Sequence, residues 1–523
     1  MREHGKRRLG AVLAAALLLG ALSGCQDTPA PSEVSSQPAE SGGNLPLEAG
    51  ALYKIVSGLS GRVMEAANFG YVEGSFVQQQ NYRGDLNQLW KAIPQEDGTY
   101  RFENQATGGY MTLKKNSQSN QAPLCVVKED AENPGQTWRL EATGNEYGEY
   151  RLRSAVSDKP AELENGKKAA GTRIVQNEAS AEIGQLWRFE KVDDGSRELP
   201  RLLLVEGAVE HSSTPEIVRY GDTYYSYIMA GGIPYKTSKD LRTWEVAGTA
   251  FPTSPQLPFG WMEREVPGGG IWAPGVYQIG DKYYLYYCIS TGGSQNSAIG
   301  VAVNTTLDHT SPDFKWEDKG MVIRSHTGDP YNCIDPNVIL DGEGLPWLVF
   351  GSYWDGVHMC RLDPATGLLD EAAPSLYPLA SRRNTPSTAI EAPFMIKHGE
   401  YYYLFAAFER MDENYHCGVG RSPCMTGPFI DKSGKPMLEG GGTAVTEAKE
   451  GIEIPGHASV FRDDNGRYYL VSEYFRRGSP SLLLIGSLVW DKDGWPVTAL
   501  TPALLSRDLS DSQTNDGKEE CKA

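Results

Sequence analysis

The feature that most constrains this chain is a five-member internal repeat in its C-terminal part. Each member is a turn containing Gly or Asp that leads into aromatic strand residues. The first glycines of the members lie about 60 residues apart, at Gly221, Gly280, Gly342, Gly399 and Gly466. A repeat of this length has room for four short strands, which is the unit of a β-propeller blade. Five such units predict a five-bladed β-propeller, which we place at residues 200–507.

A second repeat precedes the first and consists of three Gln-x-Trp motifs, which end at Trp90, Trp138 and Trp187. Their spacing is nearly equal, at about 50 residues, and each motif follows short alternating strands with Gly and Asn turns. Three similar all-β repeats predict a β-trefoil at residues 47–192, with the three Trp side chains in one shared core. The predicted fold class is therefore all-β, a β-trefoil followed by a five-bladed β-propeller.

The N-terminus has the pattern of an export signal. Basic residues from Arg2 to Arg8 precede an apolar stretch that is too short to span a membrane comfortably. Small residues then lead to Cys25, which resembles a bacterial lipoprotein processing site. We interpret residues 1–25 as a lipoprotein signal peptide and expect an exported protein that is lipid-anchored to the cell membrane or cell surface. The alternative is an ordinary signal peptide in which Cys25 is incidental.

Two polar segments flank the predicted domains. Residues 26–46 are rich in Ser, Pro, Glu and Gln and predict a flexible linker, and residues 508–523 predict a disordered tail. The formal net charge of −18 argues against nucleic-acid binding, and against membrane contact other than through the lipid anchor. A polysaccharide partner is compatible with this charge, and we expect a monomer. The cysteines lack metal-binding spacing, and Cys417 and Cys424 either pair or stay free and buried.

Residues at the starts of the predicted inner strands converge on one end of the propeller channel. Four of these strands open with a residue–Pro pair, which is tolerated at the first residue of a strand. Asp335 and Glu391 lie at two of these starts, and His457 lies at the fifth, which lacks the Pro. Glycoside hydrolysis needs a carboxylic acid and a carboxylate, and a third charge can tune the acid. Recurrence of such groups at strand starts of different blades predicts a hydrolytic site.

Several stretches around these residues resemble glycoside hydrolase family 43, and most of all its arabinan endo-1,5-α-arabinanases. They are Trp272-Ala273-Pro274, Ile334-Asp335-Pro336-Asn337, Phe350-Gly351-Ser352-Tyr353-Trp354, Glu391-Ala392-Pro393 and Asp493-Gly494-Trp495-Pro496. The resemblance implies inverting cleavage of α-L-arabinofuranosyl linkages in arabinan or related hemicellulose. It implies Glu391 as general acid, Asp335 as the residue that tunes it, and a structural calcium ion near His457. We assign Trp272 to sugar binding.

One position departs from the family pattern. The general base of the family is an Asp just before Pro in blade one, and this chain has Thr214 there. A hydroxyl does not accept a proton from water at neutral pH without help. Glu210 and Glu216 are our first candidates for a substitute base, and Glu263 and Glu265 lie in a loop that could also reach the site.

The departure at Thr214 leaves two alternatives to an ordinary hydrolase. The chain could be a surface glycan-binding protein with a hydrolytically impaired propeller, or the substrate or a distant residue could supply the base. In blade five, Ser472-Glu473-Tyr474 has no counterpart in the family pattern.

The three Gln-x-Trp units resemble ricin-B-like lectins and family 13 carbohydrate-binding modules. In those families each lobe binds sugar through a carboxylate on an early strand and a nearby aromatic ring. The resemblance implies Glu65 and Tyr82 as sugar-binding residues of lobe one and Glu164 as that of lobe three. Lobe two has Thr112 and lacks the acid. We expect the trefoil to tether the protein to its polymer; a trefoil that binds nothing, or binds protein, is the alternative.

Overall fold

The computed structural model describes residues 46–252, 258–507 and 509, which belong to one compact unit. The predicted signal peptide, all of the predicted linker except Pro46, and all of the predicted tail except Leu509 lie outside the described residues. Among the described residues no helix is long and apolar enough to cross a membrane. Almost all regular structure consists of β-strands, which form a trefoil and five separate propeller blades, as the sequence predicted.

The trefoil is a twelve-stranded sheet in which the same four-strand unit occurs three times. In each unit a strand ending in Ser or Asn precedes a hairpin, and the fourth strand begins with the Trp of the Gln-x-Trp motif. The strands are β1 (Leu52–Ser57), β2 (Val63–Ala66), β3 (Ser75–Gln80), β4 (Trp90–Pro94), β5 (Tyr100–Asn104), β6 (Tyr110–Leu113), β7 (Ala122–Val127), β8 (Trp138–Ala142), β9 (Tyr150–Ser154), β10 (Ala161–Leu163), β11 (Ile174–Gln176) and β12 (Trp187–Asp193).

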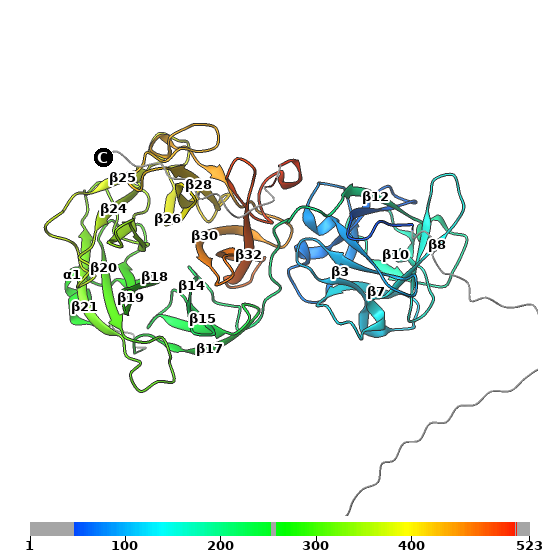
Figure 1. Cartoon of the computed structure of the whole chain (residues 1–523), viewed down its shortest axis with the longest axis horizontal. Coiled ribbons are helices and arrows are strands. Elements are labelled where there is room, and N and C mark those ends of the chain that lie inside the picture. The colour runs from blue at the N-terminus through cyan, green and yellow to red at the C-terminus, as the bar shows by residue number, and fades with distance from the viewer. Residues whose placement is uncertain (1–45, 253–257, 508, 510–523) are drawn as a thin grey trace, which may run out of the picture. The chain divides into compact units, whose positions relative to one another are not determined.

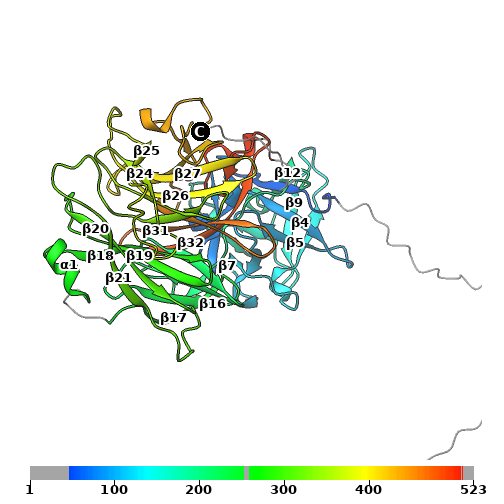
Figure 2. The same ribbon diagram turned by 60° about the vertical axis from the view of Figure 1, so that its left-hand side comes forward.

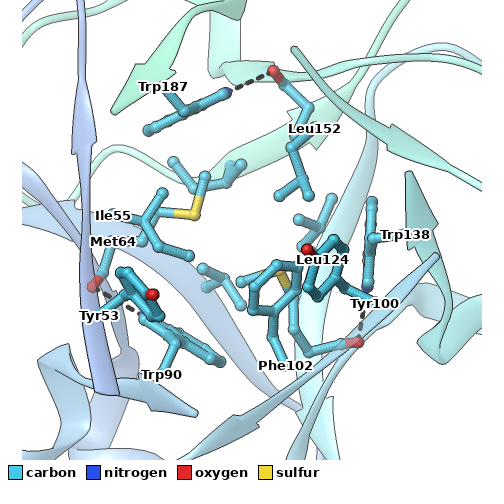
Figure 3. Packing of buried hydrophobic residues seen from close by; sticks show 14 of the residues in the cluster. Tyr53, Ile55, Met64, Trp90, Tyr100, Phe102, Leu124, Trp138, Leu152 and Trp187 are labelled. Atoms are coloured by element: carbon cyan, nitrogen blue, oxygen red, sulfur yellow. Dashed lines mark hydrogen bonds between the residues drawn. The ribbon is translucent and has the colours of Figure 1, made fainter. Parts of the chain in front are cut away.

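The three Trp side chains are fully buried and point into one core (Figure 3). Each indole N–H donates to a backbone carbonyl of the second strand of its own unit. Trp90 donates to Met64 at 3.2 Å, Trp138 to Met111 at 3.0 Å and Trp187 to Ala161 at 2.9 Å. The residues that follow these carbonyls, Glu65, Thr112 and Glu162, are therefore structurally equivalent.

The propeller has five sheets around a common centre, and in Figure 1 the labelled strands β14, β18, β26 and β30 lie on its inner side. The strands are β13 (Glu206–Gly207), β14 (Glu216–Tyr220), β15 (Thr223–Tyr227), β16 (Pro234–Ser238) and β17 (Thr243–Thr249) in blade one; β18 (Gly270–Ile279), β19 (Lys282–Ser290), β20 (Ser297–Asn304) and β21 (Glu317–Ser325) in blade two; β22 (Asn337–Leu340), β23 (Pro346–Phe350), β24 (Val357–Arg361) and β25 (Tyr377–Ala380) in blade three; β26 (Ile390–His398), β27 (Tyr401–Phe408), β28 (His416–Ser422) and β29 (Thr443–Ala444) in blade four; and β30 (Glu453–Arg462), β31 (Tyr468–Phe475), β32 (Leu482–Trp490) and β33 (Pro496–Val497) in blade five.

The blades pack on one another through apolar and aromatic side chains that alternate along each strand, which forms separate core clusters between neighbouring blades. The single α-helix of the described residues, α1 (Gly260–Glu265), lies at the outer side of blade two (Figures 1 and 2). Cys417 is a free, buried thiol, so it does not pair with Cys424.

The trefoil packs on blade five through its first lobe. Tyr71 is buried there; its hydroxyl donates to the carbonyl of Leu483 and accepts from the amide of Ile485, both at 3.1 Å. An ion pair of 2.8 Å joins Asp85 of the trefoil to Lys449 of the loop before β30. These contacts attach the first lobe to blade five.

Candidate active site

The starts of the inner strands meet in a small chamber at the centre of the propeller. Thr214, Asp335, Ala392 and His457 come from blades one, three, four and five and line a cavity of about 20 Å³. Each has a positive φ, of 49°, 56°, 51° and 45° respectively. Left-handed backbone at residues other than Gly costs roughly 1–3 kcal/mol each and is concentrated at functional sites. These residues thus adopt a strained backbone conformation that directs their side chains toward the propeller axis.

Glu391 lies on β26 and lines a cleft of about 1080 Å³ at blades two to four, next to the chamber. Its Oε1 accepts a hydrogen bond from the Tyr415 hydroxyl at 2.8 Å, and its Oε2 accepts one from the Ser352 hydroxyl at 3.4 Å. Burial raises the pKa of Glu391, against the opposing effect of these hydrogen bonds. A carboxyl whose pKa is raised keeps its proton to higher pH and is suited to donate it to a leaving group.

Asp335 lies beside Glu391 on the neighbouring blade. Its Oδ2 accepts a hydrogen bond of 2.9 Å from the backbone N–H of Ala392, the residue after Glu391. Burial raises the pKa of Asp335, and the adjacent Glu391 carboxyl raises it further. Asp335 therefore fixes the strand that carries Glu391.

Aromatic side chains form part of the cleft wall. Trp272 of β18 lines the cleft, as do Tyr353 and Trp354, which follow β23. Tyr353 and Trp354 both have positive φ, of 51° and 35°, and the Tyr353 N–H donates to the carbonyl of Ile390 at 2.7 Å. The bond to Ile390 ties this strained aromatic turn to the residue before Glu391. Rigid rings beside a carboxyl pair provide surfaces on which a sugar ring can stack.

The two base candidates from blade one do not join the Glu391–Asp335 pair. Glu210 is exposed, and its backbone carbonyl accepts from Lys236 at 2.6 Å. Glu216 lies further along the channel, where its Oε2 accepts from the Tyr277 hydroxyl at 2.8 Å, and burial raises its pKa. Thr214 is buried, and its hydroxyl has no hydrogen-bond partner among the described residues.

Glu263 and Glu265 lie on α1, at the outer side of blade two. Glu265 forms an ion pair with Arg324 of β21, which holds it against its own blade. Neither residue lines the cleft or the chamber. The loop before Trp272 therefore supplies no carboxylate to the site.

Sequence reasoning missed Glu473 as a site residue. It lies on β31 and is 4% exposed, and it lines neither the cleft nor the chamber. The Ser213 hydroxyl and the Thr214 backbone amide approach its carboxylate. Burial raises its pKa to about 7, and the charge of Glu391 adds to the effect. The available signal was a charged residue in a strand whose neighbours Leu470, Val471 and Tyr474 are all apolar or aromatic and buried.

His457 was expected to lie beside a calcium ion. Burial lowers its pKa to about 3, so the imidazole is neutral and its nitrogen lone pair is available. Calcium prefers six to eight oxygen ligands, and the described residues contain no group of three or more His, Cys, Asp or Glu side chains that could hold a metal. His457 is therefore the one side chain of the chamber that we assign to an ion, and a cavity of about 20 Å³ does not hold the several waters that would complete its coordination.

In the trefoil, the predicted sugar ligand of lobe one is covered. Glu65 is fully buried and accepts hydrogen bonds from Gln78 at 2.9 Å, Arg83 at 2.9 Å and Gln88 at 3.0 Å. Burial raises its pKa to about 7. Tyr82 is 41% exposed, and the Lys54 ammonium lies 4.8 Å from its ring centre.

In lobe three the equivalent acid is Glu162 and not Glu164. Glu162 accepts from the motif residue Gln185 at 2.8 Å, as Glu65 does from Gln88, and from Asn177 at 2.8 Å. Glu164 lies two residues on, after the strand β10 has ended. The sequence pointed to Glu164, two residues from the equivalent position, because Glu162 and Glu164 would lie on the same face of a strand. Glu162 is partly exposed.

Comparison with known proteins agrees with this geometry. Residues 209–496 match the model of glycosyl hydrolases family 43. The chain belongs to glycoside hydrolase family 43. Residues 44–126 and 134–200 match the ricin-type β-trefoil lectin domain-like family, in agreement with the threefold Trp core.

Two curated relatives of this family 43 chain are similar over most of their own length. An extracellular exo-α-(1→5)-L-arabinofuranosidase of Cellvibrio japonicus is 39% identical over 300 residues, which are 54% of this chain and 84% of the relative. An extracellular endo-α-(1→5)-L-arabinanase of Bacillus subtilis is 36% identical over 294 residues, 54% of this chain and 86% of the relative.

Solved family 43 structures resemble the propeller. An exo-1,5-α-L-arabinanase from a bovine ruminal metagenomic library has a TM-score of 0.52 at 36% identity, over 56% of this chain and 98% of that one. A Cellvibrio cellulosa α-L-arabinanase complexed with arabinohexaose has a TM-score of 0.51 at 37% identity, over 55% of this chain and 95% of that one.

Proposed function

We propose that this family 43 glycosidase cleaves α-L-arabinofuranosyl linkages in arabinan or a related hemicellulose, with inversion of configuration. The observation that carries the proposal is the pair of half-buried Glu391, at the wall of an aromatic-lined cleft, and buried Asp335, which binds the backbone next to it. Relatives that are named for action on this linkage support the choice of sugar. They also favour hydrolysis over the alternative of a glycan-binding protein with an impaired propeller.

In this reaction Glu391 protonates the leaving oxygen as the bond to the anomeric carbon breaks. Tyr415 and Ser352 hold the carboxyl in one orientation, and the raised pKa keeps the proton on it until the transition state. Asp335 keeps the Glu391 strand in register through its bond to the Ala392 amide. The bound sugar stacks on the cleft wall, to which Trp272, Tyr353 and Trp354 contribute aromatic rings.

The test is hydrolysis of linear α-1,5-arabinan by the purified protein, with the anomeric configuration of the first product followed by NMR. We expect turnover with an inverted product, and a loss of about 10²–10⁴-fold in kcat for Glu391→Gln. Equal rates for the native protein and Glu391→Gln would contradict the assignment of the acid, and a retained configuration would contradict inversion.

We propose that the trefoil binds the polymer through lobe three. Its acid, Glu162, is partly exposed and is oriented by Gln185 and Asn177, whereas Glu65 of lobe one is fully buried. Glu162→Gln should weaken retention on insoluble arabinan in a pull-down assay, and Glu164→Gln, two residues away, is the matched control. Equal losses in the two variants would argue against Glu162 as the ligand.

We propose that the protein is exported and anchored by a lipid on Cys25, and that it acts as a monomer. The signal-like N-terminus supports export, and the curated relatives described above are named as extracellular. Labelling of cells with a palmitate analogue should mark the native protein and not Cys25→Ser. Light scattering of the soluble part, from residue 26 on, should give the mass of one chain.

We propose a calcium ion at His457, next to the chamber. A bound cation would stabilise the axis, where the described carboxyls of Asp335 and Glu216 face the same chamber. Calcium should raise the melting temperature of the native protein after chelation and should not raise that of His457→Ala. A calcium effect of equal size in both proteins would place the ion elsewhere.

A further inference from the structure

The family position for the general base is occupied by Thr214, so the reaction proposed above lacks a group that activates water. Thr214 has no carboxylate, Glu210 is exposed, and Glu263 and Glu265 lie on the outer helix α1. Glu216 faces the chamber but accepts a hydrogen bond from Tyr277 there. The charge of Glu473 raises the pKa of Asp335, and the charge of Glu391 raises the pKa of Glu473. Glu473 of blade five is therefore close enough to the acid pair to be considered as the base.

Blades four and five place a glutamate at matching points of two neighbouring strands. In blade four, Glu391 on the inner strand lies opposite Ala407 on the second strand. In blade five, Gly456 takes the place of Glu391 on the inner strand, and Glu473 lies opposite it on the second strand. Opposite residues of an antiparallel pair project from the same face. Glu473 therefore leaves blade five on the face from which Glu391 leaves blade four.

Because Gly456 has no side chain, the ring of Tyr415 fits against it and forms a wall shared by the Glu391 and Glu473 sides of the site. A Cβ at this position would collide with the ring of Tyr415, which packs against the glycine and donates to Glu391 Oε1. The charges of both Glu391 and Glu473 act on the Tyr415 hydroxyl. Tyr415 thus separates two carboxyl groups that share one centre.

On its other side Glu473 reaches blade one at the residue that replaced the family base. The Thr214 amide and the Ser213 hydroxyl approach its carboxylate and favour its charged form. Its Oε2 is buried and has no hydrogen-bond partner among the described residues, and the same holds for the Thr214 hydroxyl. Buried polar atoms without a protein partner are rare and costly, and a water bound between Glu473 and Thr214 would satisfy both.

We propose that Glu473 is the general base of this enzyme and that Thr214 positions the attacking water. This inference rests on the hydrolysis proposed above and names the residue that completes it. Glu473 takes a proton from the water, the water oxygen bonds to the anomeric carbon, and the bond from that carbon to the leaving oxygen breaks. Glu391 gives its proton to the leaving oxygen, so that one water is consumed and the two carboxyls exchange protonation states, which solvent then resets.

The experiment compares Glu473→Gln, Glu473→Ala and the double variant Thr214→Asp/Glu473→Gln with the native protein on arabinan and on an aryl α-L-arabinofuranoside. We expect Glu473→Gln to lower kcat by about 10²–10⁴-fold with KM changed little. Azide should restore turnover of Glu473→Ala and yield an arabinofuranosyl azide of inverted configuration. Thr214→Asp should restore part of the activity of Glu473→Gln, because it returns a carboxylate to the family position.

Thermal unfolding of each variant shows whether it is folded. If the Gln variant is not folded, Glu473→Asp serves instead, since it keeps the charge and withdraws the carboxylate by one methylene; its kcat should fall while its melting temperature stays near the native value. Native-like kcat in Glu473→Gln or Glu473→Asp, or the absence of any azide rescue, would overturn the assignment and leave arabinan hydrolysis standing. A native protein without activity on either substrate would overturn both.

Discussion

Blades four and five are built alike and deliver their glutamates differently. Glu391 comes from the inner strand and faces a small Ala407, and Glu473 comes from the second strand and faces Gly456. In both cases a small residue on the partner strand makes room for one long acidic side chain. The comparison teaches that the centre of the propeller specifies where a carboxyl group must lie and leaves open which strand supplies it.

The two glutamates should differ most in how they respond to the leaving group. An aryl leaving group needs little protonation, so Glu391→Gln should lose far less activity on an aryl arabinofuranoside than on arabinan. Glu473→Gln should lose about 10²–10⁴-fold on both substrates, because water must be activated in either case. Steady-state kinetics on the two substrates checks this, and identical patterns for the two variants would remove the distinction between acid and base.

The buried Glu473 should make stability depend on pH. Its pKa is raised from 4.5 to about 7 in the folded protein, so folding favours the protonated form. This stabilisation is complete below about pH 4.5 and is lost as the pH rises through about 7. The loss is at most about 3 kcal/mol for a shift of this size. Urea unfolding at several pH values should show a smaller decline in Glu473→Gln than in the native protein; parallel curves would argue that Glu473 is not buried as described.

Gly456 should be intolerant of even a methyl group. A Cβ there collides with the Tyr415 ring, so Gly456→Ala should destabilise the fold by about 1–3 kcal/mol and lower kcat through displaced Tyr415. Gly342→Ala is the matched control, because a Cβ at Gly342 meets nothing within 4 Å. Denaturant unfolding and arabinan hydrolysis measure the two effects. A Gly456→Ala protein as stable and active as Gly342→Ala would show that the wall between the glutamates is not tight.

The smallest effect is expected from the tyrosine that orients the acid. The Tyr415 hydroxyl lowers the pKa of Glu391 by donating to it, so Tyr415→Phe should raise that pKa. Because Glu391 must be protonated to act, the alkaline limb of the kcat profile should move to higher pH. Tyr277→Phe is the control, since it frees Glu216 instead and should leave the profile unchanged. A shift in the control would return Glu216 to the list of bases.

The trefoil and the propeller could be predicted from the sequence because each repeat carries its own turn and core residues. The Trp spacing predicted the trefoil, and the residue–Pro pairs predicted which strand starts converge, including those next to Glu391 and at Asp335. Two points were out of reach. The choice between Glu162 and Glu164 depends on where β10 ends, and two acids one strand period apart look alike in a sequence. The sequence did not identify Glu473 as a site residue, because its position depends on the glycine opposite it on another strand and on contact with blade one. Neither of these is local in sequence.

The left-handed corners at Thr214, Asp335, Ala392 and His457 have an evolutionary consequence. Each corner is set by backbone conformation, so it persists when its side chain changes, and four blades now carry four different residues there. An ancestral enzyme with carboxylates on both blade one and blade five would have had a redundant base. Replacement of the blade-one carboxylate by Thr would then have changed activity little. The role of general base would have moved to blade five without an inactive intermediate.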